Sequence, residues 1–394
     1  MRKTALYMLL IAIAGGLTLS CENDDTDFSQ YTVGTGVDDD EAEVLNDTLV
    51  MSLTYNGTSA VVSGDESDSV TIVANGADVT VTSTLNRYLQ LVVSGTATDG
   101  SLLIYSQKKF GLVLNGVNIY NADGPAINNQ CGKALYLTLA DGTTNTLSDG
   151  TTYADAPLNA QGIAIDQKGT LFSEGQIYFA GNGTLIVYGN ARNGIASDDY
   201  IVFEEGTVNV SVSASGTNGV KVNDGFTITG GVLNIDVAAN GARGIRNEAR
   251  TTISGGQTTI TTTGNCRIET LDGVADTTTC AGIKSDSLFI MTAGELTITS
   301  SGDGGKGINC SENVEVSGGT LKVETKGTND AGKPKGVKSS TGIIVSGGSF
   351  SVSVKKSWAC DNGTDSDEPA DRLTIKGTPS SRKVEKREVY VFYE

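Results

Sequence analysis

The chain has 394 residues, a formal net charge of −18 and no histidine, with 50 glycines but only 5 prolines. The acidic balance argues against a nucleic-acid partner, because phosphate binding needs a positive surface. The absence of histidine excludes Ser-His-Asp and Cys-His catalysis and histidine-ligated zinc. Abundant glycine, threonine, valine and isoleucine favour a fold of short strands joined by tight turns.

Residues 1–20 have the pattern of a secretory signal, with a basic start, an apolar run and small residues before Cys21. The apolar run is too short to be expected to span a membrane. The sequence Leu-Thr-Leu-Ser-Cys resembles a bacterial lipobox, which implies cleavage before Cys21 and lipidation of its sulfur. Acidic residues directly after Cys21 resemble an export signal of surface lipoproteins. We therefore expect a lipoprotein of the outer membrane of a Gram-negative bacterium, exposed at the cell surface; the alternative is a secreted protein with a free Cys21.

Residues 21–47 are acidic and polar, which predicts an unfolded tether. Residues 48–369 alternate apolar and polar residues in short runs separated by Asn-Gly and Asp-Gly pairs, which predicts strands and turns throughout. Residues 370–394 lose the glycine pattern and end in Val-Tyr-Val-Phe-Tyr-Glu. We expect this tail to form capping strands over the last turn of the fold.

One pattern of about 25 residues occurs six times in the second half of the chain. Its copies begin at Gly194, Gly219, Gly244, Gly282, Gly307 and Gly336, so the steps are 25, 25, 38, 25 and 29 residues. Aliphatic residues recur at the same alternating positions, which stacks them in interior columns about 4.8 Å apart. The sequence therefore predicts an all-β fold, a single-stranded parallel β-helix with about 25 residues and three short strands per turn.

Two outward columns of the aligned repeats carry charge. The basic column consists of Lys221, Arg246, Lys284 and Lys338. The acidic column contains Asp198, Asp199, Asn223, Asp224 and Asp286. Stacked carboxylates repel each other unless a counter-charge neutralises them. Either the basic column pairs with them, or Ca²⁺ is bound between turns by these five residues. We keep both possibilities, with calcium as the predicted cofactor.

The 38-residue step contains an insertion bracketed by Cys266 and Cys280. An oxidising exterior favours a disulfide between these two cysteines. Cys131 and Cys310 are expected to be buried as small apolar residues.

A flat face lined with lysine, arginine, aspartate and asparagine suits an extended polysaccharide, whose hydroxyl and carboxylate groups need many hydrogen-bond partners. The four basic residues of the column are the predicted contacts. Tyr200 and Trp358 are candidates for stacking on sugar rings, with packing against a loop as the alternative for each.

The segments SLLIYSQ, YLTLADG, NTLSDG and NGIASDD, together with the repeated G-[IV]-K/R and SGG patterns, resemble a bacterial family of carbohydrate-binding, pectate-lyase-like β-helix proteins. The resemblance extends over about residues 50–360. It implies a right-handed helix that binds cellulosic and acidic plant polysaccharides and holds Ca²⁺, without catalysis. The acidic column weakens after Asp286, which puts metal binding at later turns in question.

We therefore expect a monomeric, non-catalytic surface protein that binds plant or other polysaccharides, with membrane contact only through its lipid anchor. Two alternatives remain open. A polysaccharide lyase would act on uronic-acid polymers with Ca²⁺ and a Lys or Arg base. An adhesin or structural spacer would use the solenoid only for its length.

Overall fold

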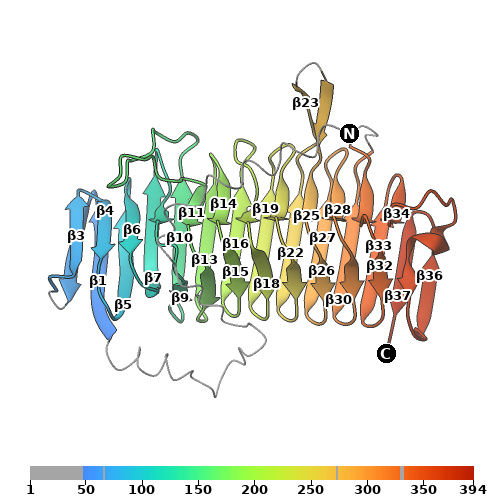
Figure 1. Cartoon of the computed structure of the whole chain (residues 1–394), viewed down its shortest axis with the longest axis horizontal. Coiled ribbons are helices and arrows are strands. Elements are labelled where there is room, and N and C mark those ends of the chain that lie inside the picture. Colours follow the sequence, from blue (N-terminus) through green and yellow to red (C-terminus); the bar gives the residue numbers. More distant parts are fainter. Residues whose placement is uncertain (1–47, 65–66, 272–273, 329–331) are drawn as a thin grey trace, which may run out of the picture. The chain divides into compact units, whose positions relative to one another are not determined.

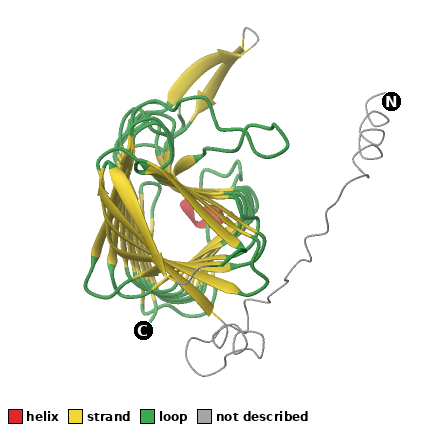
Figure 2. Cartoon of the chain, turned by 90° about the vertical axis from the view of Figure 1, so that its left-hand side faces the viewer, coloured by secondary structure: helices red, strands yellow, loops and turns green. Residues whose placement is uncertain are grey.

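The computed structural model describes residues 48–394 except 65–66, 272–273 and 329–331. This part of the chain winds into a coil of about 11 turns, with strands on its sides and loops at its corners (Figures 1 and 2). The predicted fold class, an all-β parallel β-helix of about 25 residues per turn, is confirmed. The signal segment, Cys21 and the acidic tether lie outside the described residues.

The first side of the coil is a 12-stranded sheet that is parallel except at its first pair, β3 and β4. Its strands, in order along the coil, are β3 (Val70–Asn75), β4 (Asp78–Ser83), β6 (Ser101–Ser106), β8 (Ile127–Asn129), β11 (Gly169–Ser173), β14 (Asn193–Ser197), β17 (Val220–Val222), β20 (Arg243–Asn247), β25 (Ala281–Ser285), β28 (Lys306–Cys310), β31 (Lys335–Lys338) and β34 (Trp358–Asp361).

The second and third sides belong to one larger sheet. The second side consists of β9 (Leu135–Leu139), β12 (Ile177–Ala180), β15 (Tyr200–Phe203), β18 (Gly225–Ile228), β21 (Thr251–Ile253), β26 (Phe289–Met291), β29 (Val314–Val316), β32 (Ile343–Val345) and β35 (Thr374–Ile375). The third side consists of β10 (Thr144–Asp149), β13 (Thr184–Gly189), β16 (Thr207–Val212), β19 (Val232–Val237), β22 (Gln257–Thr262), β27 (Glu295–Ser300), β30 (Thr320–Thr325) and β33 (Ser349–Val354). In the first turns β1 (Thr48–Gly57), β5 (Tyr88–Ala97) and β7 (Phe110–Asn121) run along both sides, so that β7 pairs with β9 and with β10.

Antiparallel strands cover both ends of the coil. At the first end β2 (Ser59–Gly64) pairs with β1. At the last end β37 (Glu388–Phe392) pairs with β33, and β36 (Ser381–Val384) pairs with β37, after a short 3-10 helix η2 (Pro369–Arg372). Because a parallel coil ends in unpaired backbone groups, these strands protect edges that would otherwise join another chain.

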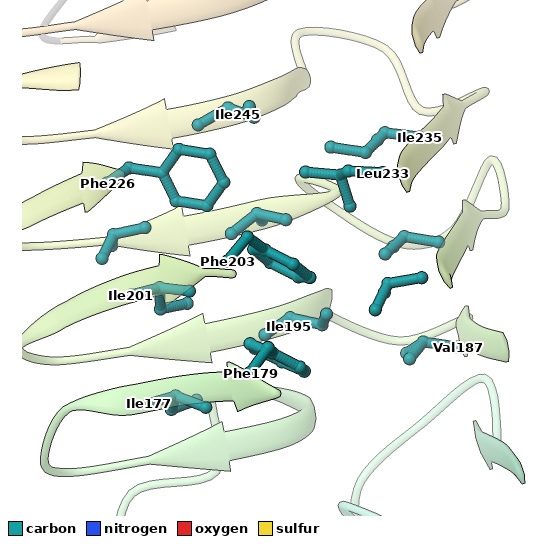
Figure 3. Close-up of a cluster of buried hydrophobic side chains, with 14 of the residues drawn as sticks. Ile177, Phe179, Val187, Ile195, Ile201, Phe203, Phe226, Leu233, Ile235 and Ile245 are labelled. Carbon is teal, nitrogen blue, oxygen red and sulfur yellow. The ribbon is translucent and has the colours of Figure 1, made fainter. Parts of the chain in front are cut away.

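Columns of apolar side chains fill the interior. Val187, Val210, Ile235, Ile260 and Ile298 are aligned on successive turns of the third side, and all are buried. On the second side the rings of Phe179 and Phe203 are stacked, with centroids 4.2 Å apart (Figure 3). The repeated sequence positions therefore become direct neighbours, as the 25-residue period predicts.

The glycine that begins each repeat is required by close packing. A Cβ atom at Gly244 would lie 2.2 Å from Ile260 Cγ2, and one at Gly307 would lie 2.1 Å from Val323 Cγ1. Real side-chain atoms do not approach this closely, so a larger residue would push the first side away from the third. The glycine thus sets the thickness of the coil, which explains its recurrence.

The insertion in the 38-residue step forms an antiparallel hairpin, β23 (Arg267–Leu271) and β24 (Val274–Thr278), that projects from the coil (Figure 1). The predicted disulfide at its base is wrong for this structure, because Cys266 and Cys280 are both free thiols. Cys280 is buried, and its Sγ donates to the Asn265 carbonyl oxygen at 2.9 Å and accepts from the Gly241 amide at 3.2 Å. The Sγ of Cys266 instead lies against Gly304. Cys131 and Cys310 are buried, as expected.

The stacked phenylalanines make a direct test of the interior. Replacing Phe203 with Ala removes a fully buried ring and should lower the free energy of unfolding by about 3–5 kcal/mol. Chemical denaturation followed by circular dichroism measures this change. The matched control is Val61→Ala on β2, where the side chain is 60% exposed and the expected change is below about 0.5 kcal/mol. Equal effects of the two substitutions would contradict the assigned core.

Candidate functional site

The predicted basic column is present on the outer face of the first side. Lys221 is aligned with Arg246, Arg246 with Lys284, and Lys338 follows after Asn309. At earlier turns the same column holds Phe172 and Ala196, which are buried. A loop of residues 150–168 lies beside them and is held to the sheet, since Asn193 Nδ2 donates to the Lys168 carbonyl oxygen at 2.6 Å. The open part of this column therefore begins at Lys221.

Acidic side chains neutralise most of the basic column. Asp286 lies 2.5 Å from Arg246 and 2.5 Å from Lys284, and Glu248 lies 3.4 Å from Lys221. Burial alone would raise the pKa of Asp286, but hydrogen bonds from Lys284 and Arg246 lower it below its usual value. Asp286 is therefore an ion-pair partner of the column, and the structure does not place it with the other predicted calcium ligands. The side chains of Lys221, Arg246 and Lys284 are only 18–27% exposed.

Four of the predicted calcium ligands lie at the corner between the first and second sides. Asn223 Nδ2 donates to Asp198 Oδ1 at 3.3 Å, and the backbone amide of Asp224 donates to the carbonyl oxygen of Asp199 at 3.2 Å. Asp199 also accepts a hydrogen bond from Gln176 Nε2 at 2.5 Å. These hydrogen bonds join successive turns at the corner.

The same corner holds a cluster of three carboxylates that we call the acidic corner, consisting of Asp166, Glu174 and Asp198. Their oxygen atoms lie within 4.8 Å of one another. Lys168 pairs with Asp198 and, at 2.6 Å, with Asp166. Burial, and then the charges of Asp198 and Asp166, raise the pKa of Glu174, while Lys168 partly offsets them. Three carboxylates thus share one ammonium group, and oxygen ligands of this kind suit Ca²⁺.

Tyrosine side chains gather on the outer face of the second side. The rings of Tyr136 and Tyr178 are stacked on adjacent turns, with centroids 5.0 Å apart. Tyr88 lies on one flank, 6.4 Å from Tyr136, and Tyr200 on the other, edge-on to Tyr178 at 5.7 Å. Tyr200 is therefore partly enclosed by other tyrosines, and its hydroxyl contacts that of Tyr178. The Tyr200 ring therefore packs against a neighbouring side chain, which was the alternative to stacking on a sugar.

Two further tyrosines are exposed on the third side. Tyr120 and Tyr188 are aligned with Ser148 between them, so they occupy one outer column two turns apart, at about 9.6 Å. Tyr120 is 41% exposed and Tyr188 is 44% exposed. The neighbouring outer column continues with Asn209 and Asn234, whose side-chain amides are hydrogen-bonded at 2.9 Å. This face combines open aromatic rings with amide and hydroxyl groups.

Comparisons with known proteins agree with the fold. The sequence matches the family model described as "Carbohydrate-binding domain-containing protein" over residues 75–248 and 234–331. The chain belongs to this family. A relative of the same description from Acetivibrio thermocellus is 34% identical over 121 residues, which cover 30% of this chain and 40% of that relative, less than half of its length. The solved polysaccharide lyase-like protein from C. thermocellum, in a gadolinium derivative, aligns with a TM-score of 0.53 at 24% identity, over 68% of this chain and 97% of that chain. At this identity the likeness shows the fold alone.

The region matched to the carbohydrate-binding family contains both groups of tyrosines, the acidic corner and the basic column as far as Lys284. Lys338 and Trp358 lie beyond it. The guanidinium carbon of Arg372 lies 3.9 Å from the centroid of the Trp358 ring, and Lys386 Nζ lies 4.5 Å from it. Trp358 therefore packs against the C-terminal cap. Packing, rather than stacking on a sugar ring, was the alternative role considered for this residue.

Of the tyrosines in these two groups, the sequence singled out Tyr200 and missed the others. Tyr136 and Tyr178 are separated by 42 residues, because the loop of residues 150–168 interrupts the period between them. A sequence alignment of the early strands that allowed the repeat length to vary would have placed Tyr136 beside Tyr178. Among the described residues, no helix is long and apolar enough to cross a membrane.

Proposed function

We propose that the protein binds an extended polysaccharide along the third side of the coil. The observation that carries this proposal is the column in which Tyr120 and Tyr188 expose their rings two turns apart. Sugar rings stack on exposed tyrosine faces, which supply contact area at a low entropic cost. A flat parallel sheet also repeats its hydrogen-bonding groups at a fixed interval, as an extended sugar chain does.

The outer columns beside the two tyrosines fit the same ligand. They continue with asparagine, threonine and serine, for example Asn209, Asn234 and Thr259, which can donate to and accept from sugar hydroxyls. Membership of the carbohydrate-binding family supports this choice of ligand class. The basic column of the first side is a second predicted contact surface, suited to carboxylates at the edge of an acidic glycan.

The predicted basic residues support polysaccharide binding better than they support the alternative function of a polysaccharide lyase. A lyase needs a basic side chain that projects alone into a cleft beside the substrate. Lys221, Arg246 and Lys284 are instead each held by a carboxylate in a regular column. An adhesin would use the same exposed surfaces without a defined sugar ligand.

The tyrosine column predicts the outcome of a binding experiment. The double variant Tyr120→Ala/Tyr188→Ala should bind soluble β-glucan or polygalacturonate at least tenfold more weakly, a loss of about 1.4 kcal/mol or more, because it lacks both stacking surfaces. Affinity gel electrophoresis measures the change over a panel of glycans.

Tyr390→Ala, which removes a tyrosine from the C-terminal cap, serves as the matched control and should bind normally. Retention of full affinity by the double variant would contradict the proposal. Release of an ultraviolet-absorbing unsaturated uronide from polygalacturonate would instead support the lyase alternative.

We also propose that Ca²⁺ binds at the acidic corner and replaces Lys168 as its counter-charge. Three carboxylates within 4.8 Å of one another and a raised pKa at Glu174 support this proposal. Glu174→Gln should then weaken calcium binding at least tenfold, whereas Lys168→Met should strengthen it, because the competing ammonium is gone. Isothermal titration with CaCl₂ in the absence of glycan measures both.

Glu295→Gln on the third side is the control, since this carboxylate lies outside the acidic corner. Opposite shifts for Glu174→Gln and Lys168→Met separate a calcium site from an ion pair alone. If neither substitution changes the titration, calcium does not bind there.

Finally, we propose that the chain is anchored through Cys21 at the outer face of the outer membrane. Support comes from the lipobox-like sequence and the acidic residues that follow it. Cys21→Ser should release the protein from the membrane fraction and abolish labelling by radioactive palmitate. Protease treatment of intact cells shows on which side the wild-type protein lies; unchanged fractionation of the variant would refute the anchor.

A further inference from the structure

A pocket of about 370 Å³ lies on the first side near the end of the coil, away from the exposed tyrosines. Its walls come from the base of the β23–β24 hairpin, from β28 and β31, from the loop before β31 and from β34. The lining residues are Thr277, Thr279, Lys306, Gly332, Lys333, Lys335, Lys338 and Asp361. Four lysines therefore face one aspartate in a protein whose net charge is −18. We call this feature the lysine pocket.

The single carboxylate of the pocket is already engaged. Asp361 Oδ2 lies 2.9 Å from Lys335 Nζ, and its Oδ1 accepts a hydrogen bond from Arg372 Nη1 at 2.8 Å. Among the described residues, no carboxylate lies within ion-pair distance of Lys306, Lys333 or Lys338. In the basic column nearby, by contrast, Asp286 joins Arg246 and Lys284. Within the described part of the chain, the lysine pocket therefore carries more positive than negative charge.

Lys306 shows the consequence most clearly. Its side chain is 5% exposed, and its Nζ donates to the carbonyl oxygen of Gly332 at 2.8 Å. Burial first, and then the charges of Lys338, Lys335 and Arg243, lower the pKa of Lys306 to about 8, with the nearby Cys266 thiol acting in the opposite direction. A buried ammonium without a counter-charge is costly, and an anion bound beside it would remove most of that cost.

More than half of the pocket lining lies beyond the region matched to the family. Lys333, Lys335, Lys338 and Asp361 follow residue 331, where the match to the carbohydrate-binding family ends. The hairpin that supplies Thr277 and Thr279 is the insertion of the 38-residue step. The pocket thus combines lysines of the repeated strands β28 and β31 with residues of the insertion.

We propose that the lysine pocket binds an oxyanion, the carboxylate or sulfate group of a single anionic sugar residue. Lys306, Lys333 and Lys338 supply ammonium donors, and charge-assisted hydrogen bonds to carboxylate or sulfate oxygens are the strong ones. Thr277 and Thr279 also line the pocket, and their hydroxyl groups are further hydrogen-bonding groups for the sugar. The volume is near the lower end of ligand pockets, so it suits one residue rather than a chain. The inference rests on the proposed function in one respect: we assume that the bound carboxylate or sulfate group belongs to a sugar.

The experiment uses the full chain with galacturonate, glucose 6-sulfate and neutral galactose as probes, and isothermal titration at pH 7. The wild-type protein should bind at least one anionic sugar with a dissociation constant on the order of 1 mM or below, and should not bind galactose. Whichever anionic probe binds more tightly identifies the source of the oxyanion. Lys306→Met and Lys338→Gln should each weaken binding at least tenfold.

Lys322→Met is the matched control, because Lys322 is an exposed lysine on β30 of the third side. Thermal unfolding of Lys306→Met checks that the variant is folded; removal of a buried charge should leave its unfolding temperature equal or higher. Affinity of the wild-type protein should fall as the pH rises above about 8, because Lys306 then loses its proton. The groups that act on Lys306 are Arg243 of β20, Lys335 and Lys338 of β31, and Cys266 beside the hairpin; Lys333 and Asp361 line the same pocket.

Three results would overturn the inference: no binding of either anionic sugar, equal binding of galactose, or unchanged affinity in Lys306→Met. Each leaves the tyrosine column untouched, because the Tyr120→Ala/Tyr188→Ala variant reports on that surface separately. Conversely, anionic sugars could bind in the lysine pocket while no polysaccharide binds. That result would refute the proposed polysaccharide function and leave the lysine pocket as an anion site.

Discussion

The fixed register between successive turns is the constraint on which the rest of the structure depends. Each strand of a parallel coil pairs with its equivalent one turn later, so a residue type repeated in the sequence meets itself about 4.8 Å away. Inside, this requirement is favourable, since Ile235 lies against Val210 and Ile260. The repeat glycines let the first side lie against the side chains of the third, where an added Cβ atom would clash with them. Outside, the same register brings like charges together, and the surface has to resolve that repulsion.

The coil resolves it in two different ways. In the basic column, carboxylates from the neighbouring corner alternate with cations, and Asp286 joins Arg246 to Lys284. Such partly exposed pairs contribute little stability each, but they leave no strong local field. At the acidic corner and in the lysine pocket the compensation is incomplete. There Glu174 and Lys306 have pKa values displaced toward their neutral forms. A charged group whose pKa is displaced in this way marks a candidate ion-binding site, and the two places have opposite sign, which is why we propose a cation at one and an oxyanion at the other.

Much of the fold could be predicted from the sequence, because the spacing of the repeat glycines and the alternation of aliphatic residues indicate the same alignment of strands between turns. Alignment at Gly219 and Gly244 alone places Lys221 beside Arg246. The disulfide was predicted from spacing and compartment alone, which cannot show the separate contacts of the two thiols: Cys280 Sγ is hydrogen-bonded to the Asn265 carbonyl oxygen, and Cys266 Sγ lies against Gly304.

The lysine pocket was missed because Lys306 and Lys335 occupy the position before the repeat glycine, a column that looks unremarkable in the aligned copies. Part of its wall, Thr277 and Thr279, comes from an insertion, and the packing of an insertion against the coil depends on contacts that a period does not encode. The tyrosines of the early turns escaped for a related reason, since the loop before β11 changes the step from one turn to the next.

These features divide the coil into two chemically different halves. Apart from Tyr390 of the C-terminal cap, the exposed and stacked tyrosines named above belong to turns before Phe203, whereas the lysines of the lysine pocket belong to turns after Gly305. Stacking on a tyrosine ring depends weakly on salt, while attraction between lysines and an oxyanion is screened as ionic strength rises. A glycan that carries anionic residues could therefore be recognised by its rings at one end of the coil and by its charge at the other. Because the sides are rigid parallel sheets, the separation between the two surfaces is fixed, and only a chain or branched glycan long enough to bridge it gains from both at once.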